Sequence, residues 1–199
     1  MRNFWRKPGA YVLFLAIILA GYFVIILVRS FSGGVPRAFS EARLQGALIS
    51  QSIVETSSKS AETLRIINQY DKEGNFKEAL GLVTAEVTRT QEMRSQAVKL
   101  SQELETMTKA LSDLNSFEAR QAALEAISNH LAVISRLVNY SDYLGRLLEV
   151  LKDRFVGNIQ NGNQVSVLVD QINAEVGSIN SFNNQATKAM ERFDILVRK

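Results

Sequence analysis

The sequence contains no cysteine, two prolines and a single histidine, His130, in 199 residues. Without cysteine, the chain has no disulfide, no thiolate zinc or iron–sulfur site and no cysteine nucleophile. One histidine leaves no histidine cluster for a metal ion and only one imidazole for acid–base chemistry. We expect His130 to be a packed or half-exposed structural residue. These absences argue against most enzyme classes.

Catalytic and cofactor motifs are also missing. The sequence has no GxSxG, P-loop or GxGxxG pattern, so the hydrolase, NTPase and dinucleotide signatures are absent. Asp71 opens an acidic stretch, but a calcium loop of the EF-hand type needs glycine at position six and glutamate at twelve. Counting from Asp71, Gly74 stands at position four and Leu82 at twelve. We therefore expect no metal, no cofactor and no enzymatic activity.

Positive charge is concentrated at the N-terminus. The chain has 23 Lys and Arg against 20 Asp and Glu, for a net charge of +3. Residues 1–29 contain four basic and no acidic side chains, so residues 30–199 carry a small negative charge. A nucleic-acid-binding protein would need basic side chains massed on its folded surface. The sequence therefore predicts no nucleic-acid partner.

A long uncharged segment follows the basic stub of residues 1–8. Gly9–Val28 is twenty residues without a charge, which as a helix is about 30 Å long and matches the hydrocarbon core of a bilayer. The apolar core of a signal peptide runs to about 7–15 residues, so this segment is long for one. The segment predicts a retained transmembrane anchor over residues 9–29. Cleavage after a signal peptide, near residues 30–32, is the alternative.

The orientation of this anchor in the cell membrane depends on charges at its two ends. Basic residues stand on both sides, so the positive-inside rule is nearly balanced. A short and wholly basic N-terminal stub usually stays in the cytoplasm. We therefore expect a single-pass protein whose remaining residues lie on the extracytoplasmic side.

Beyond a Gly/Pro linker at residues 30–36 the chain has no proline, which permits long helices. Apolar side chains then recur in steps of three and four, the spacing of a helical bundle or coiled coil. In the second helix the seam is Val83, Val87, Thr90, Met93, Ala97, Leu100, Leu104, Met107, Leu111 and Leu114. In the third it is Leu124, Ile127, Leu131, Ile134, Val138, Ser141, Leu144, Leu148, Leu151 and Phe155.

The pattern predicts an all-α fold, an antiparallel four-helix bundle with coiled-coil-like packing over residues 37–199. Its helices are expected at about 37–70, 75–114, 116–156 and 163–198. Residues 71–74 and 157–163 have the composition of turns. The break near residues 112–116 rests on Asn115 and Glu118, which have the spacing of a helix N-cap and its partner. One continuous helix from Phe76 to Val156 is the alternative.

Aligning the four helices in height predicts an unusually polar level. Its candidate ligand-binding residues are Ser57, Ser60, Thr90, Arg94, Ser141, Asn180 and Asn183. A buried polar layer is costly unless it is hydrogen-bonded, so it needs a reason. One interpretation is a small-ligand pocket in which Arg94 holds an anion. The other is a layer that fixes the register of the helices.

Two resemblances accompany these patterns. The layout of basic stub, apolar segment and bundle resembles the sensor half of a chemoreceptor-type transmembrane receptor, although these 199 residues contain neither a second span nor a signalling module. Tyr70–Leu80 is similar to the helix-hairpin turn of tetratricopeptide and microtubule-interacting-and-trafficking domains, without a 34-residue repeat after it.

The sequence thus predicts a membrane-anchored, non-enzymatic binding, sensor-like or scaffold module. Its expected partners are the lipid bilayer and either a protein or a small polar ligand, and it could form homo-oligomers. The alternative is a tether or assembly factor facing the cytoplasm, which pairs with partner helices through its heptad seams.

Overall fold

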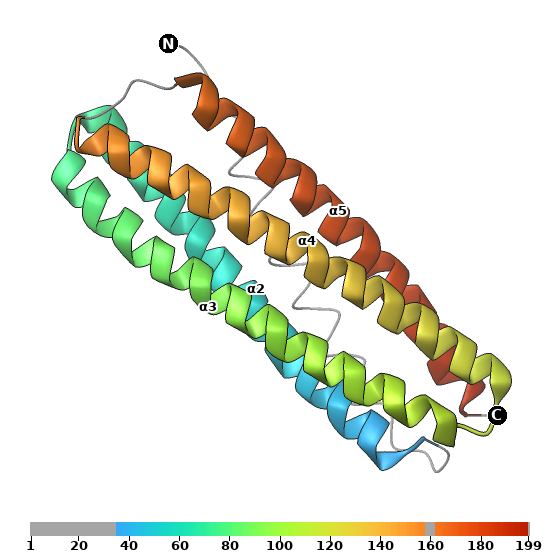
Figure 1. Cartoon of the computed structure of the whole chain (residues 1–199). Coiled ribbons are helices and arrows are strands. Elements are labelled where there is room, and N and C mark those ends of the chain that lie inside the picture. The colour runs from blue at the N-terminus through green and yellow to red at the C-terminus, as the bar shows by residue number, and fades with distance from the viewer. Residues whose placement is uncertain (1–34, 158–161, 199) are drawn as a thin grey trace.

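The computed structural model describes residues 35–157 and 162–198, and these residues form an all-α fold (Figure 1). The elements are α2 (Arg37–Glu73), α3 (Phe76–Lys109), the short 3-10 helix η1 (Ala110–Asp113), α4 (Phe117–Phe155) and α5 (Gly162–Leu196). Within the described ranges there is no strand. The predicted all-α class with four long helices is confirmed.

The anchor predicted at residues 9–29 lies outside the described residues. Among the residues that the structure does describe, no helix is both long and apolar enough to cross a membrane.

The four long helices alternate in direction and lie side by side as a bundle (Figure 1). Each has 34 to 39 residues, so the bundle is about 50–60 Å long. The end of α5 returns to the beginning of α2, where the rings of Phe39 and Phe193 are 5.0 Å apart. The α2 and α5 backbones otherwise keep apart, at Cα separations beyond 8 Å along nearly their whole length. The other three neighbouring pairs approach each other more closely.

Gly74 makes the turn between α2 and α3. Its φ of +76° is in the left-handed region, which glycine enters without a steric penalty. The amide of Asn75 donates a hydrogen bond of 2.9 Å to the carbonyl oxygen of Tyr70, which closes the end of α2. Helix α2 therefore runs on to Glu73, through residues predicted to form the turn.

The chain breaks between α3 and α4, which excludes one continuous helix. Leu114 is extended, and the Ser116 hydroxyl accepts a 3.1 Å hydrogen bond from the amide of Ala119. This bond satisfies one of the amides left free at a helix start. The break was predicted correctly, but its cap is Ser116 rather than Asn115.

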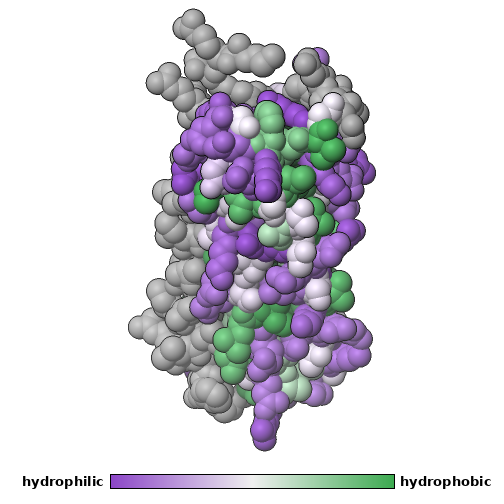
Figure 2. Space-filling model, turned by 90° about the vertical axis from the view of Figure 1, so that its left-hand side faces the viewer, coloured by the Kyte–Doolittle hydropathy of each residue, from purple (hydrophilic) through white to green (hydrophobic). Residues whose placement is uncertain are grey.

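Two apolar clusters fill the interior. The cluster near the α2 start is rich in alanine and includes the ring pair Phe39 and Phe193, whereas the other is built mainly of leucine, isoleucine and valine. Figure 2 shows that one outer face is mostly hydrophilic, with apolar patches between the polar side chains.

The first half of α4 departs in part from its predicted seam, whereas the later members Ser141, Leu144, Leu148, Leu151 and Phe155 are buried as predicted. Leu124 and Leu131 were expected in the core, but they are 49% and 47% exposed. The buried stripe instead passes through alanines such as Ala119, Ala123 and Ala126. These small side chains repeat with the same period, so a pattern of large apolar residues did not reveal them.

Candidate functional site

The structure buries most of the predicted polar layer. Buried members are Ser57, Ser60, Thr90, Ser141 and Asn183. Asn180 is half-buried, and Arg94 is exposed. Five of the seven candidates therefore lie in the bundle interior, where a polar group is costly unless it has a partner.

Arg94 does not face this interior. Its side chain is 52% exposed and forms an ion pair of 3.0 Å with Asp142 on the neighbouring helix α4. Arg94 follows the fully buried Met93, and one residue turns a helix by about 100°. The structure therefore does not bring Arg94 into the buried layer, and anion binding by Arg94 stays a prediction. Ligand binding at the remaining residues stays a prediction.

Two of the four buried hydroxyls of this layer are bonded within their own helices. Thr90 and Ser141 each donate a hydrogen bond of 2.9 Å to the carbonyl oxygen four residues earlier. Ser57 instead contacts the sulfur of Met93 across the α2–α3 interface at 3.8 Å. Hydroxyls satisfied in this way offer a ligand few free donors. Of these three hydroxyls, only that of Ser57 contacts another helix.

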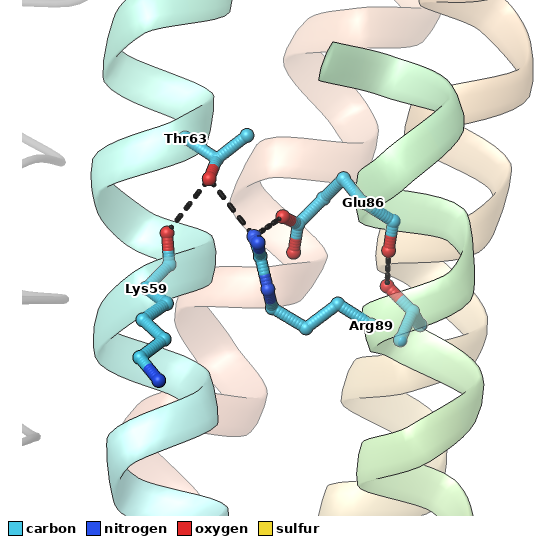
Figure 3. Close-up of polar contacts among 5 residues, drawn as sticks. Lys59, Thr63, Glu86 and Arg89 are labelled. Atoms are coloured by element: carbon cyan, nitrogen blue, oxygen red, sulfur yellow. Dashed lines mark hydrogen bonds and ion pairs between the residues drawn. The ribbon is translucent and has the colours of Figure 1, made fainter. Parts of the chain in front are cut away.

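Glu86 is the most unusual buried residue of this layer, and it was not among the predicted residues. Its side chain is fully buried, and one carboxylate oxygen accepts a hydrogen bond from Arg89 on the same helix (Figure 3). Arg89 also donates to the hydroxyl of Thr63 on α2 at 2.9 Å, and Thr63 donates to the carbonyl oxygen of Lys59. This chain of hydrogen bonds joins α2 to α3.

The second carboxylate oxygen of Glu86 has no such partner. Within the described part of the chain, Oε1 of Glu86 and the nearby Ser60 hydroxyl are buried and make no hydrogen bond of ordinary length and angle, although Ser60 is close enough to act on the Glu86 carboxylate. Burial raises the pKa of Glu86, while the nearby Ser60 hydroxyl and the Arg89 guanidinium act in the opposite direction. Burial and the charge on Glu86 also raise the pKa of Tyr140 on α4. The electrostatic effect of Glu86 therefore reaches a third helix.

The sequence carries a signal for this burial. Steps of three, four and three residues from Val83 lead to Glu86, Thr90 and Met93. All four residues are buried. The predicted seam took Val87 in place of Glu86, because valine is apolar. An acidic residue on a strict heptad position is the pattern that identifies a buried carboxylate.

A second buried carboxylate joins α4 to α5. Glu175 of α5 is 7% exposed. It accepts a hydrogen bond of 3.3 Å from the Asn139 amide and lies 3.6 Å from the Arg136 guanidinium.

A small pocket lies toward the end of the bundle where α2 begins. It has a volume of about 30 Å³, which is room for one or two water molecules. Its lining residues are Arg43, Gly46, Ser50, Leu100, Leu104, Met107, His130, Thr187 and Met190. Ligand-binding pockets are typically ten or more times larger.

Two ionisable groups on this pocket are constrained by their surroundings. Arg43 forms two hydrogen bonds with Asp194, at 2.7 and 2.9 Å, and both side chains are mostly buried. Burial, helped by the positive charge of Arg43, lowers the pKa of His130 to about 4. His130, a half-buried side chain, is therefore neutral at pH 7.

In the ranges that the structure describes, no group of three or more acidic or histidine side chains could hold a metal ion. No protein-family model matches the chain, and no curated protein or solved structure matches it either.

Proposed function

We propose that this chain is a membrane-anchored helical bundle that acts as a non-enzymatic scaffold or binding module. The observation that carries the proposal is the uncharged segment Gly9–Val28, which a short Gly/Pro linker joins to a bundle beginning at Arg37. Twenty apolar residues suffice to span a bilayer as a helix. The linker would hold the bundle next to the membrane.

The hydrogen bonds of the buried polar side chains support the scaffold role. The hydroxyls of Thr90 and Ser141 are satisfied within their own helices. Arg89, which is bonded to Glu86 on α3, donates to Thr63 of α2, and Glu175 of α5 accepts from Asn139 of α4. The contacts between helices help to fix the register of a bundle. The outer surfaces of helices about 50–60 Å long are then available for a protein partner.

We place the bundle on the extracytoplasmic side, because the short N-terminal stub is wholly basic. The test is the protease sensitivity of a C-terminal tag in intact cells or spheroplasts. Two results together would support the proposal: the uncleaved tagged protein is found in the membrane fraction, and protease added outside the cells removes the tag. A tag protected until lysis would reverse the orientation, and a soluble tagged domain in the medium would contradict the anchor.

A cytoplasm-facing tether that pairs with other helices is the second candidate. The exposed leucines of α4, at Leu124 and Leu131, favour it because they belong to a heptad pattern that the core does not use. Protection of the tag until lysis would support this candidate.

A further inference from the structure

Helices α2 and α3 form one antiparallel hairpin of the bundle, and α4 and α5 form another (Figure 1). Polar contacts join α2 to α3 at more than one level. At one level, the amide of Gln96 donates a hydrogen bond of 2.8 Å to the hydroxyl of Ser52. About three turns further along α2, Arg89 donates to the hydroxyl of Thr63. The first hairpin is therefore held together along its length.

The second hairpin is held together in the same way. Arg192 of α5 forms an ion pair with Glu125 of α4. About three to four turns further along α4, Asn139 donates a hydrogen bond to Glu175 of α5. The Glu175 carboxylate also lies 3.6 Å from the Arg136 guanidinium. Each hairpin therefore has contacts of its own that do not involve the other hairpin.

Two contacts close the α2–α5 seam, along which these two helices face each other, near the end where α2 begins. The rings of Phe39 and Phe193 are 5.0 Å apart, and Arg43 forms two hydrogen bonds with Asp194. Phe39 and Arg43 are about one turn apart, and Phe193 and Asp194 are consecutive, so both contacts lie at one level. We call these four residues the latch. The backbones of α2 and α5 stay at Cα separations beyond 8 Å along nearly their whole length.

The opposite side of the bundle is joined more firmly. The chain itself connects α3 to α4 through η1, and these helices approach each other more closely than α2 and α5 do. Arg94 of α3 also pairs with Asp142 of α4 at 3.0 Å. At the far end of the bundle, Arg154 of α4 pairs with Asp71 of α2, but the Arg154 side chain is 45% exposed, and such pairs contribute little stability. A rotation of the hairpins about the α3–α4 interface therefore breaks few of the contacts between helices.

Packing next to the latch is incomplete. The pocket of about 30 Å³ lies beside Arg43, and its walls include Gly46 of α2 and Thr187 and Met190 of α5. Atoms that line an empty space lose part of their dispersion attraction, so α2 and α5 gain less from closing here than at a filled interface. The latch therefore supplies a large share of the attraction across this part of the seam.

We propose that the bundle opens along the α2–α5 seam and that the latch holds it closed. In the open state the two hairpins rotate apart about the α3–α4 interface, and each keeps the contacts of its own helices. Opening uncovers the apolar wall of the pocket, which includes Leu100, Leu104 and Met107 of α3. The bundle thus has a closed and an open form. This inference goes beyond the proposed function, and it depends neither on the anchor nor on its orientation.

The test measures distances between pairs of spin labels, which can be placed freely because the sequence has no cysteine. The full chain is purified in detergent micelles and labelled at cysteines introduced at exposed positions. Leu48→Cys on α2 and Lys188→Cys on α5 span the seam. The matched control combines Leu48→Cys with Val98→Cys on α3, which spans the first hairpin. Both pairs are measured with the latch intact and with Asp194→Asn.

Removal of the charge at Asp194 should open the seam and leave the hairpins intact. We expect the distances between residues 48 and 188 to gain a second population that is longer by about 10 Å, one helix diameter. The open fraction should be about fivefold or more above that of the protein with the latch intact. The distances between residues 48 and 98 should not change.

Reversal of the two charges separates the ion pair from other effects of substitution. Arg43→Asp alone places two carboxylates next to each other and should also open the seam. Arg43→Asp combined with Asp194→Arg restores a pair of opposite charges and should return most molecules to the closed distance. Side chains that served packing alone would not be rescued by this exchange.

Other outcomes contradict the proposal. A seam that stays closed in both Asp194→Asn and Arg43→Asp would show that the latch does not hold it. Equal broadening of both sets of distances, or a loss of helical content by circular dichroism, would show that the bundle loosens as a whole instead of opening on one side. An open fraction that the charge-reversed double variant does not lower would remove the ion pair from the latch.

Discussion

Arg43 and Asp194 stand 151 positions apart in the chain and form two parallel hydrogen bonds, at 2.7 and 2.9 Å. They join α2 to α5, whose backbones otherwise keep apart. Both side chains are mostly buried, so the pair is screened little by water. The pair is therefore the principal polar link between α2 and α5 among the described residues.

Asp194→Asn should destabilise the bundle by about 1–3 kcal/mol, because it leaves the mostly buried Arg43 without a charged partner. The control is Glu125→Gln, which breaks the exposed pair with Arg192 and should cost about 0.5 kcal/mol or less. Chemical denaturation measures both free energies of unfolding. Equal losses in the two variants would contradict the importance given to the Arg43–Asp194 pair.

Glu86→Gln should make the bundle more stable at pH 7. Because the pKa of Glu86 is raised on folding, the folded state pays a penalty once the pH exceeds the unfolded value of about 4.3. The gain over the unchanged protein should therefore shrink as the pH falls toward about 4. Glu92→Gln, at an exposed position of α3, should change little at any pH. A loss of stability in Glu86→Gln at pH 7 would show that its pair with Arg89 outweighs the cost of burial.

His130 should make the bundle less stable in acid. The unfolded chain takes up a proton at His130 below about pH 6.5, whereas the folded chain does so only near pH 4. This group therefore lowers the free energy of unfolding as the pH falls through that window, by up to about 3 kcal/mol. Thermal unfolding of His130→Gln between pH 7 and pH 4 should show a shallower decline than the unchanged protein. Parallel declines would refute the effect.

Gly74→Ala should cost about 1 kcal/mol, because alanine is strained at a φ of +76°. Its Cβ would meet no atom within 4 Å, so the cost comes from the backbone alone. Gly81→Ala is the matched control, since its Cβ also has open space but its backbone is helical. That control should gain about 0.5–1 kcal/mol. A stabilised Gly74→Ala variant would contradict the left-handed cap.

The fold was largely accessible to sequence reasoning, because helix length, turns and period depend on local chemistry. Gly74 and the segment around Ser116 mark two of the helix ends in the sequence itself. The stripe of α4 that faces the core was harder to predict. Leu124 and Leu131 have the right period for a core, yet alanines on another face are buried instead. When two faces of a helix carry apolar residues with the same period, only packing against the other helices decides which face is buried.

The candidate site was predicted in part. Aligning the helices in height identified Ser57 and Thr90, which are buried, but height alone does not fix the direction of a side chain. Arg94 therefore lies at the surface, because it comes one position after Met93 of the buried seam. Glu86 was overlooked because a charged residue is not expected in a core, although the heptad steps pass through it.

The meeting of α2 and α5 at one end also determines how the bundle responds to load. A pulling force applied between residues 35 and 198 acts on two neighbouring helices at the same end, beside Phe39 and Phe193. Such a force peels α2 away from α5 one contact at a time, rather than sliding the helices past each other. The Arg43–Asp194 pair would be among the first contacts to bear this force.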